Sequence, residues 1–465
     1  MGRRLWILLA LLVVVTATAL LLRSGPPKQP DIVLITIDTL RADALGAYGN
    51  TKGLTPHLDA FAASGIVFEN ATSHLPETRP SHASILTGLY PRTHGVVANN
   101  LLLPQSALTL PERLKEAGYR TAASVGVTLL SPTAGFAQGF DTFHWPSDQN
   151  MIRAYNVVLP AIEWLESTTT DEPIFLWIHV FDPHQPYDPV DLFDIHSPPE
   201  IKERIPQLSW HDFRSAAQAN GGDLPRVHLE RALALYDAEV ATVDYELGRL
   251  IDALSKTGRD DAAIIVTADH GECFSNGIYF EHSNCLYDGA IHVPLMASFP
   301  GEIEPGLRQP EPYELIDIAP TVLRWAGLEP DEAIEGEGLF AAPDEWGYFQ
   351  HPLYRAVDVV RRQETNSLIK SVAGDPSRPI VGDRELLGAR SSTWKYFWSD
   401  LGEELYYLPD DPEESTNLAE SDDDTRSDLR RTVNLWRQQH PLILQGDGND
   451  LTEEMRKQLE ALGYL

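Results

Sequence analysis

The chain has 465 residues, of which 43% are hydrophobic and 22% charged; this composition excludes a disordered chain and suits one large domain with a smaller appendage. Its 68 acidic and 36 basic residues give a net charge of −32. Because so acidic a surface repels DNA and RNA, we expect no nucleic-acid partner.

The first segment has the features of a membrane anchor. An apolar run of 18 residues, 5–22, lies between Arg4 and Arg23. At about 1.5 Å per helical residue such a run nearly spans a bilayer core of roughly 30 Å, and the preceding basic residues favour an inside N-terminus. We therefore expect residues 1–30 to form a signal anchor with a linker, and the body to be extracytoplasmic. A cleaved signal peptide is the alternative, and it also exports the body.

Short apolar runs rich in β-branched residues alternate with helical patterns along much of the chain. The runs lie at 31–37, 121–127, 174–180 and 263–268, and the helical patterns at 110–118, 152–166 and 229–254. Such runs are typical of strands buried on both faces, and their alternation with helices predicts a parallel sheet covered on both sides. We predict an α/β catalytic domain over residues 31–345, with ligands beyond the carboxyl ends of its strands.

The pattern changes twice outside this alternation. Residues 186–226 lack periodicity and are rich in Pro, Asp and His, which predicts a long loop over the site. Beyond them, short aromatic runs predict a small antiparallel sheet in a C-terminal subdomain, residues 346–445. We expect a tail helix within residues 446–465.

The chain has two cysteines, Cys273 and Cys285. An exported location permits a disulfide between them. Sequence alone leaves open whether they pair, because pairing depends on the distance between the two backbones.

Acidic and imidazole side chains follow two of the predicted strands. Asp38 ends the first strand, and Asp269 and His270 follow the strand at 263–268. Since the carboxyl ends of parallel strands meet at one edge of a sheet, these side chains can converge on a divalent cation. Each alone would suit a cap or an ion pair, but together they favour a metal site.

Residues 78–88 (TRPSHASILTG) predict a helix with Thr78 as its N-cap, Pro80 in its first turn and Gly88 at its end. The simplest interpretation is a capped helix and nothing more. The functional interpretation places the Thr78 hydroxyl at the positive end of the helix. An anionic ester is stabilised there, and a bound metal would lower the pKa of the hydroxyl.

Several blocks of the sequence resemble the motifs of the sulfatase family, within the alkaline-phosphatase superfamily. They are DTLRAD at 38–43, TPHLD at 55–59, DPH at 182–184, TADHGE at 267–272, HVPL at 292–295, DIAPT at 317–321 and ELY at 404–406. Residues 78–88 resemble the nucleophile motif of the family, Cys or Ser-x-Pro-x-Arg followed by Leu-Thr-Gly. The blocks keep the family order, so the resemblance implies an alkaline-phosphatase-like fold.

The resemblance also implies roles for individual residues. The implied metal ligands are Asp38, Asp269, His270 and Thr78, of which Thr78 is also the nucleophile. His184 matches a histidine that binds the substrate oxyanion or assists the leaving group, and His282 lies where many relatives place a lysine or histidine near the transferred group. The imidazole of His270, where calcium sulfatases usually carry Asn, favours zinc or manganese, with calcium as the alternative.

Two departures from the family pattern affect the chemistry. Family sulfatases oxidise a Cys or Ser to formylglycine, whereas Thr78 cannot yield that aldehyde because its Cβ carries a methyl group. His82 replaces the arginine of the motif, so a fixed positive charge is lost or becomes pH-dependent. Relatives with a threonine nucleophile act on phosphorus, which favours a phosphate ester here.

We therefore predict a metal-dependent hydrolase that cleaves a sulfate ester or a phosphate (di)ester through a Thr78-bound intermediate, with His184 or His282 protonating the leaving group. One alternative is a membrane-anchored transferase that passes the group to a lipid or glycan. Another is a catalytically silent binding protein that kept the fold.

Overall fold

The computed structural model of the chain describes residues 29–168, 172–189, 192–194, 199–204, 216, 224–274, 282–283, 285–341, 346–351, 386–399, 402–443, 452, 455 and 457. The predicted membrane helix at residues 5–22 lies outside these ranges, as does most of the predicted tail helix. Among the described residues, no helix combines the length and apolarity needed to cross a membrane.

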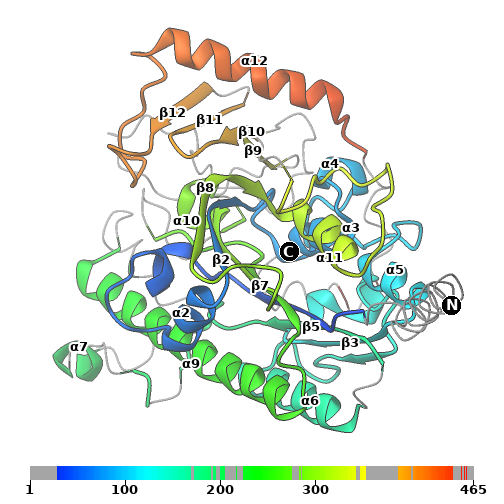
Figure 1. The fold of residues 1–465 in the computed structure, drawn as a ribbon. Coiled ribbons are helices and arrows are strands. Elements are labelled where there is room, and N and C mark those ends of the chain that lie inside the picture. The colour runs from blue at the N-terminus through cyan, green and yellow to red at the C-terminus, as the bar shows by residue number, and fades with distance from the viewer. Residues whose placement is uncertain are drawn as a thin grey trace, which may run out of the picture.

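The central sheet has eight strands in the order β4-β3-β5-β1-β6-β7-β2-β8 (Figure 1). Their bounds are β1 Ile32–Ile37, β2 Ile66–Thr72, β3 Arg120–Val125, β4 Thr142–His144, β5 Ile174–Val180, β6 Ala263–Ala268, β7 His292–Ser298 and β8 Leu307–Glu314. Every residue of the central strands β1, β5 and β6 is buried. This is why their sequences are apolar without alternation, and the α/β prediction is confirmed.

The sheet is mixed, so the prediction of a parallel core is wrong on one side. Strands β4, β3, β5, β1 and β6 are parallel, whereas β7 is antiparallel to both β6 and β2. The described residues that follow β6 and those that precede β7 lie at the same edge of the sheet, where the Gly271 N–H donates to the Ala290 carbonyl at 2.7 Å. Since β7 begins at the edge where β6 ends, it runs antiparallel to β6.

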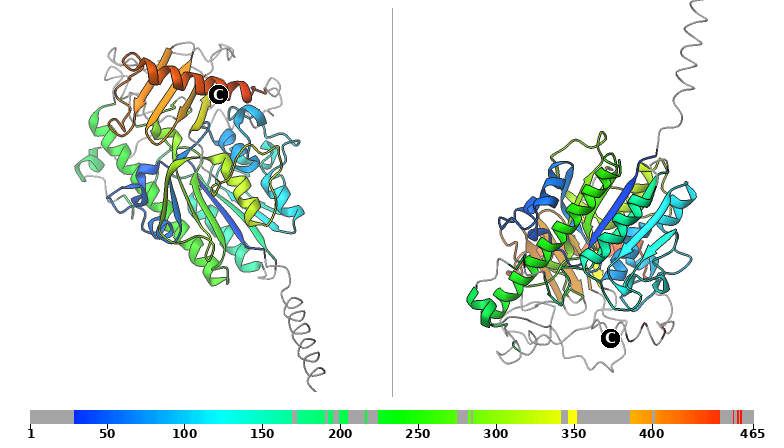
Figure 2. Two further views of the ribbon diagram at one scale, coloured as in Figure 1. Left: turned by 45° about the horizontal axis from the view of Figure 1, so that its top comes forward. Right: turned by 90° about the horizontal axis from the view of Figure 1, so that it is seen from below.

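Helices cover both faces of the sheet (Figure 2). Helices α2, α6 and α9 pack against one another on one face, and α3, α5 and α11 on the other. The bounds are α2 Pro56–Ala63, α3 Thr78–Thr87, α4 Pro91–His94, α5 Leu110–Glu116, α6 Ala154–Ser167, α7 Pro199–Arg204, α9 Arg226–Lys256, α10 Asp288–Ile291, α11 Ile318–Trp325 and α12 Asp423–Gln439. Helix α7 lies within the segment predicted to be a loop; at six residues it is too short to produce a periodic pattern.

A second, antiparallel sheet follows the first, as predicted. Its order is β12-β11-β10-β9. The bounds are β9 Gly347–His351, β10 Leu386–Arg390, β11 Trp394–Ser399 and β12 Gly402–Tyr407. Helix α12 covers this sheet (Figure 1), and its buried Trp436 stacks on Tyr348 with ring centroids 4.9 Å apart. The domain boundary near residue 345 stays a prediction.

A buried ion pair joins the amino-terminal ends of three central strands. Arg259, which precedes β6, donates from Nη1 to Asp31 Oδ2 at 2.5 Å, and both side chains are buried. The other oxygen of Asp31 accepts from the backbone N–H of Ile174, the first residue of β5, at 3.0 Å. Asp31 directly precedes β1, so this pair ties β1 to β5 and β6 at the end opposite the strand termini described below.

We expect Arg259→Leu to lower the free energy of unfolding by about 3 to 5 kcal/mol, because the Asp31 carboxylate stays buried without its counter-charge. Denaturant unfolding would measure the change. Arg308→Gln is the matched control, since Arg308 and Glu69 form an exposed pair that should contribute less than about 1 kcal/mol. Equal losses in the two variants would contradict this reasoning.

Candidate active site

The carboxyl ends of two neighbouring strands bring three candidate metal ligands together. Asp38 follows β1, and Asp269 with His270 follows β6, which pairs with β1. One ligand atom from each of the three lies within 4.8 Å of the others, and all three residues are buried. The Thr78 hydroxyl, from the first turn of α3, donates to Asp38 Oδ2 at 3.4 Å. The sequence-predicted residues thus meet at one point.

Three facing atoms of this cluster have no hydrogen-bond partner within the part of the chain that the structure describes. They are Asp38 Oδ1, Asp269 Oδ2 and His270 Nε2. The histidine nitrogen lies 3.7 Å from the Asp38 oxygen and 3.6 Å from the Asp269 oxygen. His270 Nδ1 is 3.0 Å from the Gly271 carbonyl; since a carbonyl only accepts, we assign the proton to Nδ1, so that the Nε2 lone pair faces the two carboxylates. Two carboxylate oxygens and such an imidazole fit a divalent cation.

Burial makes the charged forms of these groups costly. It raises the pKa of Asp38 to about 6. Burial and the Asp38 charge raise the pKa of Asp269 well above its usual range, and burial with the nearby His282 lowers the pKa of His270. Two buried carboxylates of like charge repel each other, and a divalent cation between them would offset both the repulsion and the desolvation cost.

Helix α3 begins one residue earlier than predicted, so Thr78 as its N-cap is wrong. Thr78 is the first helical residue, and the N-cap is Glu77, whose side chain makes no capping bond. Glu77 Oε2 instead accepts from the N–H of Asn99 at 2.6 Å. The Thr78 hydroxyl is therefore not used on the helix backbone and points at Asp38. Gly88 ends the helix with φ 71°, as predicted.

His82 places a neutral imidazole where the family motif has a permanently charged arginine. Burial and the nearby His179 lower its pKa well below the usual range. Its Nδ1 lies 2.7 Å from the Thr78 carbonyl, so we assign the proton to Nδ1, and its Nε2 lies 3.0 Å from the Thr36 hydroxyl. His82 therefore contributes no positive charge, which decides between the two outcomes that its sequence left open.

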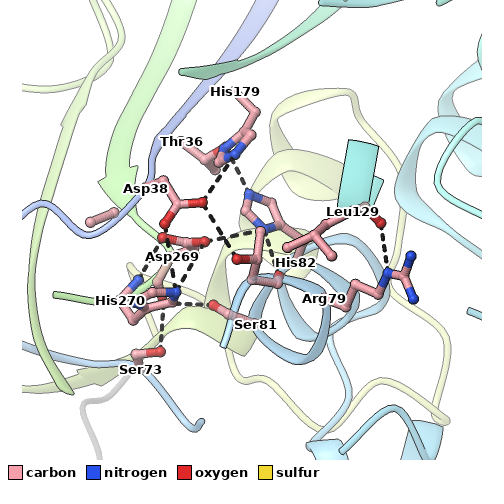
Figure 3. Close-up of polar contacts among 12 residues, drawn as sticks. Thr36, Asp38, Ser73, Arg79, Ser81, His82, Leu129, His179, Asp269 and His270 are labelled. Carbon is pink, nitrogen blue, oxygen red and sulfur yellow. Dashed lines mark hydrogen bonds and ion pairs between the residues drawn. The ribbon is translucent and has the colours of Figure 1, made fainter. Parts of the chain in front are cut away.

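His179 is a site residue that sequence reasoning missed. It lies in β5 opposite Thr36 of β1, and its Nδ1 is 3.2 Å from the Thr36 hydroxyl. Its Nε2 faces Asp38 Oδ2 at 3.5 Å. His82, Thr36 and His179 thus form a buried polar path beneath the ligand cluster (Figure 3). The available signal was a histidine inside an otherwise apolar strand, which needs a polar partner when buried.

His184 and His282 both lie beside the ligand cluster. The His282 ring stacks on His270 with centroids 4.5 Å apart, and its centroid is 5.1 Å from that of His184. His282 Nδ1 faces Glu272 Oε1 at 3.3 Å; Glu272 was part of a recognised motif, but its contact with His282 was not predicted. His184 Nδ1 lies 2.6 Å from the Gln185 carbonyl, and burial lowers the pKa of His184 to about 4.

The question left open about the cysteines is answered by the structure. Cys273 and Cys285 form a disulfide, with Cα atoms 6.5 Å apart. Cys273 directly follows Glu272, and His282 lies between the two cysteines in the sequence. The disulfide therefore limits how far the residues beside Glu272 and those beside His282 can move apart.

The chain is similar to known proteins in both sequence and fold. Residues 30–328 match the family profile described as Sulfatase. The Arylsulfatase of Clostridium perfringens is 27% identical over 463 residues, covering 85% of this chain and 91% of the relative. The Choline-sulfatase of Rhizobium meliloti is 27% identical over 448 residues, covering 84% and 83%. The crystal structure of the phosphonate monoester hydrolase of Agrobacterium radiobacter superposes with a TM-score of 0.69 at 20% identity, covering 91% of this chain and 98% of that one, and so has the same fold.

We expect Asp269→Asn to abolish divalent-cation binding and to raise the melting temperature of the metal-free protein. The substitution removes a metal ligand and, at the same time, the repulsion between two buried carboxylates. Thermal unfolding of chelator-treated protein, with and without added Zn²⁺ or Mn²⁺, would measure both effects. A metal-dependent rise in melting temperature that persists in Asp269→Asn would place the cation elsewhere.

Proposed function

The chain belongs to the sulfatase family of ester hydrolases, and from this premise we propose that it cleaves phosphate diesters through a covalent phosphothreonine at Thr78. The observation that carries the proposal is the Thr78 hydroxyl 3.4 Å from Asp38, beside three converging ligand atoms. We propose that Asp38, Asp269, His270 and Thr78 bind one divalent cation, with zinc or manganese favoured by the imidazole.

The nucleophile favours phosphorus over sulfur for a chemical reason. A formylglycine hydrate expels sulfate by elimination, but the methyl group on Cβ denies Thr78 that route. A sulfated threonine would be released only by attack at sulfur or at Cβ. A phosphothreonine can instead be hydrolysed by attack of activated water at phosphorus. Sulfate esters remain the substrates that the names of the sulfatase relatives suggest, and they are the competing class in the test below.

The charge of the site favours a monoanionic ester. The described side chains in contact with Asp38, Asp269 and Thr78 include no Lys or Arg, and His82 is neutral. The two carboxylates balance one divalent cation, and the Glu272 carboxylate balances the proton that His282 gives in the step below. No surplus positive charge is then left for a second negative charge on the substrate. A phosphate diester carries one charge, whereas a phosphate monoester carries up to two at neutral pH.

In the first step, Thr78 Oγ1 attacks phosphorus in line, its proton moves towards Asp38 Oδ2, and the bond to the leaving oxygen breaks. A divalent cation bound at the cluster would lower the pKa of the Thr78 hydroxyl and polarise the ester oxygen. The amino end of α3 stabilises negative charge developing on the phosphoryl oxygens. His282, whose Nδ1 faces Glu272 Oε1 at 3.3 Å, protonates the leaving alkoxide.

In the second step, a water molecule attacks phosphorus, the bond to Thr78 Oγ1 breaks, and Oγ1 takes back the proton held by Asp38, which releases the phosphate monoester. The proton taken from the water replaces the one that His282 gave to the alkoxide. We propose His184 as the base. Its Nδ1 proton is directed to the Gln185 carbonyl, and its lowered pKa keeps the ring neutral, so its Nε2 can accept a proton from water. The two histidines thus take different roles, whereas sequence reasoning left them interchangeable.

The cellular location of the enzyme and its attachment to a membrane stay predictions from the sequence. The Cys273–Cys285 disulfide supports an exported body, because disulfides persist in oxidising compartments. The apolar run at residues 5–22 supports the proposal of a membrane anchor. In the transferase alternative, a lipid or glycan hydroxyl takes the place of water and accepts the phosphoryl group from Thr78.

Thr78→Ala should abolish turnover while leaving the fold intact, because the hydroxyl caps no helix and only the nucleophile is lost. Bis-p-nitrophenyl phosphate should be a better substrate for the wild-type protein than p-nitrophenyl phosphate or p-nitrophenyl sulfate. Mass spectrometry of enzyme quenched during turnover should find phosphate on Thr78. Full activity of Thr78→Ala, or clear preference for the sulfate ester, would refute the proposal.

The separate roles of the two histidines predict different kinetic defects. His282→Ala should lose about 10² to 10⁴ in rate on diesters with alkyl leaving groups, but little on p-nitrophenyl diesters, whose leaving group needs no proton. His184→Ala should slow both substrates alike and accumulate phosphothreonine. Burst kinetics and mass spectrometry distinguish these cases, and the same leaving-group dependence in both variants would contradict the assignment.

A further inference from the structure

The short helix α10 lies directly against the segment that carries two candidate metal ligands. The Gly271 N–H donates to the Ala290 carbonyl at 2.7 Å. The contact is so close that a Cβ atom on Gly271 would lie 2.1 Å from the Gly289 carbonyl oxygen. Any shift of α10 would therefore displace the backbone next to His270.

A second contact leads from α10 to Asp269. The Ile291 carbonyl, at the end of α10, accepts from the N–H of Ser73 at 2.8 Å. The Ser73 hydroxyl in turn donates to the Asp269 carbonyl at 2.5 Å. Both residues of the 269–270 pair are thus held by neighbours that α10 positions.

The other side of α10 is held by three buried charged residues of the C-terminal sheet and the loop after it, which form a cluster with Asp288. Asp288, the first residue of α10, accepts from Arg390 Nε and Nη2 at 2.9 and 2.8 Å and from Lys395 Nζ at 3.0 Å. Its backbone N–H donates to Glu414 Oε2 at 2.6 Å. Lys395 and Glu414 also pair with each other at 2.6 Å, and their side chains are 0% and 2% exposed.

The charges of this cluster balance, with two cations and two carboxylates. Although burial opposes ionisation, Arg390 and Lys395 lower the pKa of Asp288 far below its usual range. Arg390 comes from β10 and Lys395 from β11, so Asp288 is fixed by two strands of the second sheet at once. A bidentate guanidinium contact defines direction as well as distance.

We propose that Asp288 is a positioning residue for the metal site, through which the C-terminal sheet sets the placement of Asp269 and His270. This inference rests on the proposed metal site and adds a function for the second sheet. The path runs from Arg390 and Lys395 through Asp288 to α10, and from α10 through Gly271 and Ser73 to the two ligands. Removing a contact that orients a metal ligand typically changes metal affinity about 10- to 100-fold.

The test is divalent-cation affinity, which a merely stabilising ion cluster would not change. Asp288→Asn should raise the dissociation constants for Co²⁺ and Zn²⁺ about 10- to 100-fold. Calorimetry on chelator-treated protein would measure them. The visible spectrum of the Co²⁺-loaded variant should also differ from that of the wild type, because the ligands are displaced. Asp288→Asn alone leaves one surplus cation in the cluster and should lower the melting temperature. Adding Lys395→Met restores the charge balance and should recover the melting temperature, while the affinity for the divalent cation stays weakened.

Arg430→Gln is the matched control. Arg430 pairs with Glu403 of β12 in the same sheet, but this pair does not involve α10. It should keep wild-type affinity and spectrum. Wild-type affinity in both Asp288 variants would overturn the inference, and so would equal weakening in Arg430→Gln. If the wild-type protein itself bound no divalent cation, both the proposed metal site and this inference would be refuted.

Discussion

Two buried carboxylates at the ends of adjacent strands are the constraint on which the rest of the structure depends. Asp38 and Asp269 are both fully buried, His270 Nε2 lies 3.7 and 3.6 Å from them, and the facing atoms have no hydrogen-bond partner among the described residues. Holding like charges together in a protein interior is unfavourable unless a cation binds there. The surrounding contacts, from Thr78 to Ser73, can be understood as supports that keep this unfavourable arrangement ready for a divalent ion.

The neutral path beneath the cluster connects this constraint with the chemistry. His82, Thr36 and His179 occupy fully buried positions and bring polar atoms to both carboxylates without adding charge. A fixed arginine at the position of His82 would leave surplus positive charge at the site. Its absence reduces the attraction for a dianion, and Thr78 removes the elimination route that formylglycine provides. The charge and the nucleophile therefore favour the same substrate class.

The reversal of β7 connects the catalytic edge with the C-terminal sheet. Because β7 begins at the edge where β6 ends, the described residues between the two strands include the candidate ligands Asp269 and His270, as well as Glu272, His282 and the disulfide, and they end in α10. That helix is where Asp288 meets the cations of β10 and β11. The mixed topology thus places α10 between the candidate site and the second sheet.

Local patterns and motifs in the sequence alone determined much of the fold and most residues of the candidate site. The strands β1, β3, β5 and β6, the helix after Thr78 with its glycine end, and the residues of the ligand cluster all follow from short-range signals, because apolar runs and helix ends are encoded within a few residues. Only the tertiary structure decided the direction of β7, the neutral state of His82, the part of His179 and the link through Asp288. Each of these depends on contacts between residues far apart in the chain, and on burial, which sets the charge of a group only after its neighbours are in place.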